Sequence, residues 1–217
     1  MEIIVVPDPH ATLDAYQRWP SDPAVKTPVV VFYNQDVLRQ AFLHVCQGLR
    51  VEEGGEQVDV RREVKGILFG LPANLPAEGH IQTWIHAHEP LPILETDGPA
   101  HCQYRARDKA HIQILLESKF KGLQVVGWYH SHPNIGVFLS DTDRVTVEKD
   151  FPHPQQIALV FDPVRDEAAF FVWEDGKVDQ HPSREYFAPS KCLGVSIPPV
   201  DLVGVSSTVD VVEEESS

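Results

Sequence analysis

The sequence predicts a mixed α/β domain in which a curved sheet of about six strands is flanked by two or three helices. Three observations lead to this class. Apolar runs typical of strands alternate irregularly with segments of helical periodicity, several strands follow one another as hairpins, and no internal repeat is visible. With 217 residues, 42% hydrophobic and 23% charged, the chain suits one soluble domain with flanking segments.

The first regular elements begin at residue 29. Val29–Phe32 is β-branched and aromatic, as expected of a strand, and Asn34 suits the N-cap of a following helix. That helix carries apolar residues at helical spacing, namely Val37, Leu38, Ala41, Phe42, Val45 and Leu49. Residues 52–59, "EEGGEQVD", are predicted to be a solvated loop, and strands follow at 62–71 and 80–88.

The second half continues the alternation. Residues 108–120 form a predicted helix whose apolar stripe comprises Ala110, Ile114, Leu115 and Phe120. "LQVVGWYHSH" (123–132) is predicted to be a buried strand, and a short helix follows from Ser140. "QIALVFDP" and "AAFFVWEDGKV" are predicted to pair as a hairpin, with "EDGK" as the turn signal.

These elements divide the chain into three parts. Residues 1–28 are an N-terminal extension with one predicted strand, Ile3–Val6, in an otherwise irregular segment. Residues 29–187 form the domain. Residues 188–217 are a tail, rich in β-branched residues and ending in acidic ones.

Composition excludes several classes of function. The net charge of −14 repels phosphate backbones, so nucleic acid is not expected as a partner. No stretch approaches eighteen apolar residues, so no membrane span is expected, and "MEIIVVPDPH" lacks the basic start of a signal peptide. The three cysteines, Cys46, Cys102 and Cys192, form no Cys-x-x-Cys pair, which favours a reducing compartment. We therefore expect a cytoplasmic protein, whose oligomeric state the sequence leaves open.

"GWYHSHPNIGVFLSDTD" (127–143) contains a candidate metal site. His130 and His132 are two residues apart, which on a strand places both imidazoles on one face, while Tyr129 points the other way. Asp143 adds an oxygen ligand. Two histidines and one aspartate, with no cysteine nearby to close the site, are typical of catalytic rather than structural zinc.

A catalytic zinc needs a general base beside its water, and the best upstream carboxylate is Glu63. Ser140 could donate a hydrogen bond to the oxyanion formed when water attacks a carbonyl. An alternative stays open for Ser140 and Asp143, because Ser-x-x-Asp is also a helix capping box, and capping would compete for the Asp143 carboxylate. The pair in "HAH" (86–88) has the same spacing without a following Ser-x-x-Asp, and we expect it to be structural.

These residues resemble a known family. "HSHPNIGVFLSDTD" is similar to the signature of the JAMM, or MPN-plus, metallopeptidases: His-Ser/Thr-His-Pro, seven residues between the second histidine and the serine, and then Ser-x-x-Asp. "EVKGILFG" resembles the family's upstream glutamate segment, and "QIALVFDP" resembles the strand after the site. The resemblance covers about residues 29–173.

The resemblance implies a cytidine-deaminase-like fold with one catalytic Zn2+. It assigns His130, His132 and Asp143 as ligands, Glu63 as general acid/base and Ser140 as oxyanion stabiliser. Family members hydrolyse isopeptide or peptide bonds after the C-terminal glycine of ubiquitin or a ubiquitin-like protein, and some bacterial members serve ubiquitin-like conjugation systems.

Because all five motif positions are filled, we expect a zinc isopeptidase that acts on ubiquitin or a ubiquitin-like partner, by deconjugation or by precursor processing. The alternative is a non-catalytic MPN-type scaffold that only binds such a partner. A nucleobase deaminase would need His-x-Glu and Pro-Cys-x-x-Cys, which the chain lacks.

Overall fold

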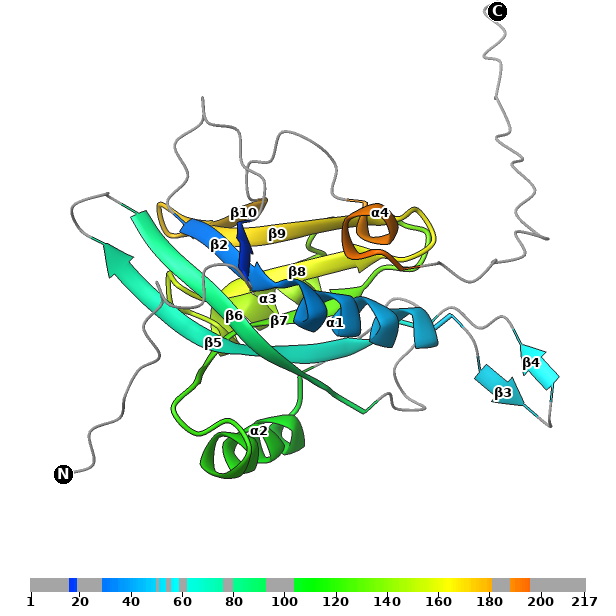
Figure 1. Cartoon of the computed structure of the whole chain (residues 1–217), viewed down its shortest axis with the longest axis horizontal. Coiled ribbons are helices and arrows are strands. Elements are labelled where there is room, and N and C mark those ends of the chain that lie inside the picture. The colour runs from blue at the N-terminus through cyan, green and yellow to red at the C-terminus, as the bar shows by residue number, and fades with distance from the viewer. Residues whose placement is uncertain are drawn as a thin grey trace, which may run out of the picture.

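The computed structural model describes residues 16–18, 29–49, 51–53, 56–58, 62–75, 80–92, 104–180 and 188–195. These ranges contain a curved eight-stranded sheet, a separate two-stranded sheet and four helices (Figure 1). None of these helices is both long enough and apolar enough to cross a membrane. The predicted strand Ile3–Val6 lies outside the described residues.

The main sheet is mixed, as predicted, but it has eight strands rather than about six. Its order is β1-β2-β6-β5-β7-β8-β9-β10, and neighbours are antiparallel except β2 with β6 and β7 with β8. The eight strands are β1 (Tyr16–Arg18), β2 (Val29–Asn34), β5 (Lys65–Leu75), β6 (His80–Pro90), β7 (Gln124–Ser131), β8 (Ile157–Asp162), β9 (Glu167–Glu174) and β10 (Lys177–Gln180). The strand with His130, β7, is therefore central and has a partner on each side.

Two predictions about turns are wrong. The described residues of the predicted loop at 52–59 belong to two strands, β3 (Val51–Glu53) and β4 (Glu56–Val58), which pair antiparallel. Their polar composition obscured the Gly-Gly hairpin signal in the sequence. The predicted pairing of "QIALVFDP" with "AAFFVWEDGKV" is confirmed, because β8 and β9 are antiparallel neighbours, but the "EDGK" turn joins β9 to β10. Asp175 and Gly176 have φ values of 48° and 76°, the left-handed pair that a two-residue hairpin turn requires.

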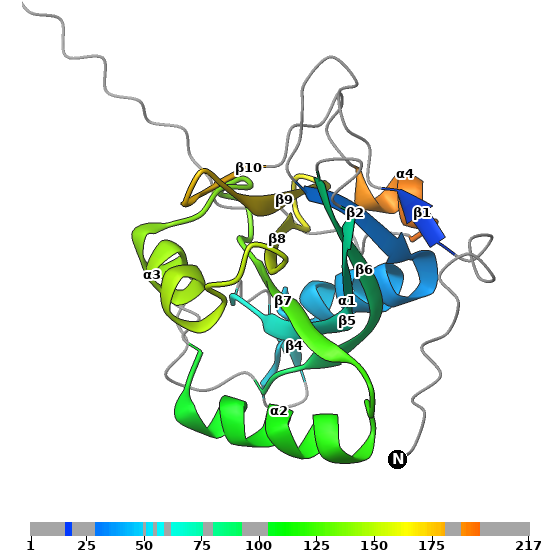
Figure 2. The same ribbon diagram turned by 90° about the vertical axis from the view of Figure 1, so that its left-hand side faces the viewer.

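The four helices cover both faces of the sheet. They are α1 (Gln35–Gln47), α2 (Ala106–Ser118), α3 (Asp141–Asp150) and the short α4 (Pro189–Leu193). Residues of α1 and α4 share one apolar core with the sheet, whereas residues of α2 and α3 share another on the opposite face (Figure 2). The predicted start of α1 is confirmed, because Asn34 Oδ1 accepts from the backbone N–H groups of Asp36 and Val37.

The buried stripe of α2 differs from the prediction. Ile112 and Leu115 are buried, but Ile114 is 62% exposed. Ile112 and Leu115 are three residues apart and share one face, which packs into the core with Trp128, so Ile114 is turned outward.

Short pieces of both predicted flanking segments take part in the fold. β1, within residues 1–28, pairs with β2. Leu193 and Val195, within residues 188–217, are buried in the core beneath α1. The division of the chain into three parts stays a prediction.

Candidate metal centre

The structure brings His130, His132 and Asp143 together. His130 lies near the end of β7, His132 follows that strand directly, and Asp143 lies in the first turn of α3. All three are buried. The two Nε2 atoms are 3.1 Å apart, and each is 3.4 Å from Asp143 Oδ2. The two imidazoles lie together, as the strand spacing predicts, and the Asp143 carboxylate lies close to both of them.

This arrangement fits a zinc ion. With ligand bonds of about 2.0–2.1 Å, the ligand atoms of a tetrahedral zinc lie about 3.3 Å from one another. The three distances given above agree with that spacing. Of the described cysteines, Cys46 is a buried residue of α1 that packs in the core and Cys192 is exposed on α4, so neither completes the set. Two nitrogens and one oxygen would leave a fourth position for water or substrate.

Burial and charge act in opposite directions in this cluster. Burial lowers the pKa of His130, although the Asp143 carboxylate opposes this effect. Burial also disfavours the charged form of His132, but hydrogen bonding and charge from Asp143, with Glu63, outweigh it and raise its pKa. For Asp143, burial is outweighed by the charge of His130 and by hydrogen bonds from His130, His132 and Ser140, so its pKa lies well below the usual range. The aspartate is therefore a carboxylate, the form that binds a metal.

Glu63 lies beside the cluster, although it is far from it in sequence. Its side chain is buried, and Oε1 is 3.7 Å from His132 Nε2. The next residue, Val64, is fixed to β7 by two hydrogen bonds. Val64 N donates to Ser131 Oγ and Ser131 N donates to Val64 O, each at 2.9 Å. Ser131 thus holds the glutamate segment against the histidine strand, a role that the sequence analysis missed.

Ser140 is the N-cap of α3. Its Oγ accepts from Asp143 N at 3.2 Å and donates to Asp143 Oδ2 at 2.6 Å, and Ser140 N also donates to that oxygen at 2.8 Å. The capping box predicted as an alternative is therefore present, and it uses the carboxylate oxygen that faces the histidines. The oxyanion role of Ser140 stays a prediction.

The two histidines are held differently. The His130 ring is stacked on Trp128, with centroids 4.4 Å apart, and its Nδ1 has no hydrogen-bond partner among the described residues. His132 Nδ1 instead lies 3.2 Å from the carbonyl oxygen of Gly136. If His132 binds zinc through Nε2, this contact would fix the proton on Nδ1 and the plane of the ring.

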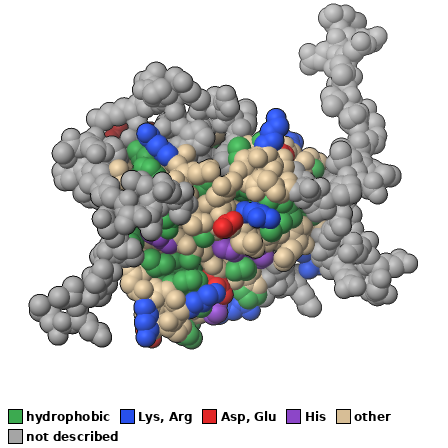
Figure 3. Space-filling model, viewed as in Figure 1, with side chains coloured by type: hydrophobic (Ala, Val, Ile, Leu, Met, Phe, Trp, Pro, Cys, Tyr) green, Lys and Arg blue, Asp and Glu red, His purple; other side chains and the backbone are tan. Residues whose placement is uncertain are grey.

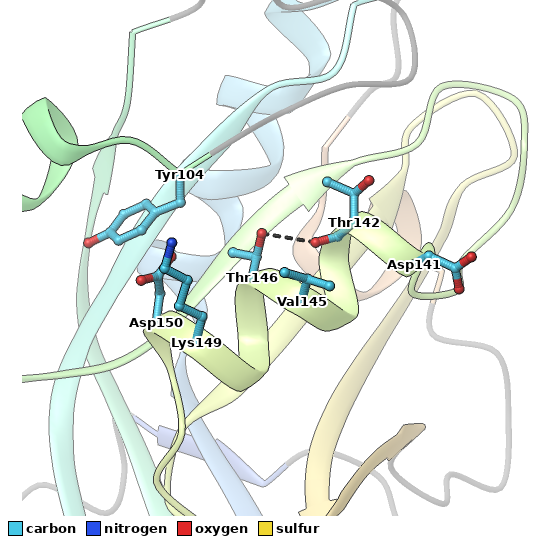
Figure 4. A pocket seen from close by; sticks show the side chains of 7 residues that line it. All are labelled: Tyr104, Asp141, Thr142, Val145, Thr146, Lys149 and Asp150. Atoms are coloured by element: carbon cyan, nitrogen blue, oxygen red, sulfur yellow. Dashed lines mark hydrogen bonds between the residues drawn. The ribbon is translucent and has the colours of Figure 1, made fainter.

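A pocket of about 420 Å³ lies beside α3 (Figure 4). Its lining residues are Tyr104, Asp141, Thr142, Val145, Thr146, Lys149 and Asp150. Thr146 Oγ1 donates to the Thr142 carbonyl at 3.0 Å, so this hydroxyl is already used within the helix. None of the five predicted site residues lines the pocket, which is therefore separate from the metal cluster.

Tyr129 points to the face of β7 opposite the one that carries His130, as alternation along a strand predicts. Its hydroxyl lies 2.9 Å from His44 Nδ1 and 3.2 Å from His88 Nδ1. The Tyr129 ring also occupies the space where a Cβ on Gly66 would lie, with ring atoms 2.2 Å from that position. His88, from the "HAH" pair, therefore supports the core instead of joining the metal cluster.

These two imidazoles border a second pocket of about 420 Å³ between α1 and the end of β6. Its lining residues are Gln40, Leu43, His44, Gln47, His88, Pro90, Leu91 and Pro92. On the side of the molecule that shows α1, histidine side chains reach the surface among apolar and charged ones (Figure 3).

We expect His44 to make the stability of the protein depend on pH. Burial lowers its pKa from 6.5 to about 4, with a smaller contribution from His88. The unfolded chain therefore binds a proton between pH 6.5 and 4 that the folded chain excludes, so stability falls as pH falls through this window. From pH 7 to 4.5, the wild type should lose about 2 kcal/mol more than His44→Gln. Urea unfolding of both proteins, in chelator and at the two pH values, measures the loss of stability. Equal losses in the wild type and in His44→Gln would contradict the prediction.

Comparison with known proteins agrees with the geometry. A family model described as "JAB1/Mov34/MPN/PAD-1 ubiquitin protease" matches residues 35–156, more than half of the chain. The chain belongs to this family. The curved mixed sheet with helices on both faces is the fold of this JAB/MPN domain, and the resemblance found in the sequence is confirmed.

Several relatives of this JAB/MPN chain are curated. COP9 signalosome complex subunit 5 of Eremothecium gossypii is 28% identical over 169 residues, covering 76% of this chain and 35% of the relative. COP9 signalosome complex subunit 5 of Caenorhabditis elegans is 33% identical over 127 residues, covering 57% of this chain and 31% of the relative. Ubiquitin carboxyl-terminal hydrolase RPN11 of Saccharomyces cerevisiae is 37% identical over 59 residues, covering 26% and 19%. The chain thus matches about a third or less of the length of these relatives.

Proposed function

We propose that the chain is a zinc-dependent isopeptidase or peptidase that cleaves after the C-terminal glycine of ubiquitin or a ubiquitin-like protein. One observation carries the proposal: the buried Glu63 carboxylate lies beside a His130, His132 and Asp143 cluster whose spacing suits zinc. The names of the relatives above and the description of the family support this class of substrate. A cytoplasmic location, inferred from the cysteines, belongs to the same proposal.

His130, His132 and Asp143 would hold the zinc, which supplies Lewis-acid polarisation of a carbonyl and activation of water. Glu63 would take the proton from the attacking water and return it to the departing amine. Its burial keeps bulk water away from this transfer. Ser140 could turn its hydroxyl hydrogen from Asp143 toward the developing oxyanion.

Removal of zinc tests the proposal. Metal-free protein, prepared with a chelator, should cleave a ubiquitin or ubiquitin-like fusion on the order of 10²-fold or more slowly than the wild type, because polarisation of the carbonyl and activation of water are lost. Adding one equivalent of zinc should restore the rate. The measurement is release of a reporter that follows the C-terminal glycine, across a panel of ubiquitin and ubiquitin-like proteins.

Two outcomes would contradict the proposal. Equal cleavage with and without zinc would remove the metal from the mechanism. Zinc-loaded protein that cleaves no member of the panel but binds one of them would favour the scaffold alternative. A fusion with alanine in place of the C-terminal glycine controls for non-specific proteolysis.

A further inference from the structure

Asp162 ends β8 next to the metal centre. Because β7 and β8 are parallel neighbours, their carboxyl ends meet at one edge of the sheet, where His132 leaves β7. The Asp162 side chain is fully buried, and its carboxylate accepts hydrogen bonds from four backbone N–H groups. The distances are 3.0 Å to Asn134 N, 2.7 Å to Gly136 N, 3.0 Å to Val164 N and 3.1 Å to Arg165 N.

These four bonds serve two different segments. The bonds from Val164 and Arg165 are local and hold the turn that follows β8, as an aspartate commonly does. The bonds from Asn134 and Gly136 reach across to the loop after His132. The turn alone does not need them, so their effect is to fix that loop on the end of β8.

Two residues of the loop after His132 have left-handed backbone conformations. Asn134 and Gly136 have φ values of 68° and 89°, in the left-handed region that is unfavourable for most residues. Arg165 adds a contact from Nη2 to the Asn134 carbonyl at 3.2 Å, and its Nε is 3.5 Å from Asp162 Oδ2. His132 N is also bonded to the Phe161 carbonyl at 2.8 Å. The end of β8 thus holds both His132 and the loop after it.

We propose that Asp162 is the positioning residue for the metal ligand His132 and acts through Gly136. The N–H of Gly136 donates to Asp162 Oδ2, and the carbonyl of the same residue lies 3.2 Å from His132 Nδ1. The carboxylate thereby sets the acceptor that orients the imidazole and keeps Nε2 directed at the cluster. This inference rests on the proposed zinc function, but it concerns a residue outside the ligand set.

Asp162→Asn tests the proposal with little change of shape. The asparagine oxygen can accept the three bonds that Oδ1 accepts, but its amide group then faces the N–H of Gly136, and two donors repel each other. Competition with a chromophoric zinc chelator should show zinc affinity about 10- to 100-fold below wild type. In zinc-loaded protein, the Nδ1 proton of His132 should exchange faster with water, as observed by NMR.

The matched control is Asp166→Asn in the same turn. Asp166 accepts bonds from Ser190 N and Ser190 Oγ, so this change affects the anchoring of α4 but not the loop after His132. Its zinc affinity should stay within about twofold of wild type, even if its melting temperature falls. A general loss of stability would instead weaken zinc binding in both variants in proportion to the fall in melting temperature, and that result would overturn the proposal.

If Asp162→Asn does not fold, Gly136→Ala gives a second test, because alanine is strained at φ 89° and shifts the carbonyl that meets His132. Wild-type zinc affinity in either folded variant would overturn the positioning role. Wild-type protein that binds no zinc would refute the proposed metal centre instead, so the two failures are distinguishable.

Discussion

Glu63→Gln should lower kcat/KM for a ubiquitin-like fusion by about 10²- to 10⁴-fold while zinc stays bound, because a neutral amide cannot take the proton from the attacking water. Glutamine has nearly the same shape, so the buried site should keep its packing. Glu63 lies 3.7 Å from His132 Nε2 and is not one of the three clustered ligands. The measurement combines zinc content by elemental analysis with single-turnover cleavage.

The control for this change is Glu89→Gln. Glu89 lies on β6 away from the cluster and forms an ion pair with the exposed Lys119 at 2.8 Å. Loss of such a surface pair changes stability by less than about 1 kcal/mol and should leave cleavage within about twofold of wild type. A Glu63→Gln protein that holds zinc and cleaves at the wild-type rate would show that another group is the base.

Gly70→Ala should lower the free energy of unfolding by about 3 kcal/mol or more. A Cβ at Gly70 would lie 1.7 Å from the carbonyl oxygen of Trp84, which is backbone of the neighbouring strand and cannot rotate away. Gly70 lies in β5, which pairs with β6 on one side and with β7 on the other. Separation of these strands would loosen the part of the sheet that holds Glu63 and His130 in position. Urea unfolding in chelator measures the loss without the contribution of bound metal.

The matched change is Gly176→Ala in the turn between β9 and β10. A Cβ there would meet nothing within 4 Å, but the φ value of 76° is unfavourable for alanine. The backbone conformation alone should cost about 1–2 kcal/mol. If Gly70→Ala costs no more than Gly176→Ala, the close approach between Gly70 and Trp84 does not exist in solution.

The sequence predicted features that depend on residues near one another in the chain. His130 and His132 lie on one face because a strand alternates every residue, and Asn34 and Ser140 cap helices because their side chains reach the next turn. The predicted stripe of α2 was only partly right, because Leu115 is buried but Ile114 is exposed. A short amphipathic segment offers more than one choice of buried face, and in the folded protein Ile112 and Leu115 join the core cluster that contains Trp128.

The complete site could not be predicted without knowing the order of the strands in the sheet. The proximity of Glu63 depends on β5 lying beside β7 and on the two bonds between Val64 and Ser131, which no local pattern reveals. In the sequence, Asp162 stands only near the end of the apolar run "QIALVFDP". Its bonds from Asn134 and Gly136 arise because β7 and β8 run parallel and end together, whereas its other two backbone bonds are local to the turn after β8.

The sequence by itself therefore determined the identity of the candidate ligands, the face of the strand on which two of them lie, and the presence of a glutamate able to serve as base. Only the tertiary structure decided that this glutamate meets the histidines, that the Ser140 cap and the metal cluster share one oxygen of Asp143, and that Asp162 holds the loop after His132. Periodicity and capping act within a few residues. Contacts between distant segments depend on strand order and register, which are settled only when the whole sheet packs.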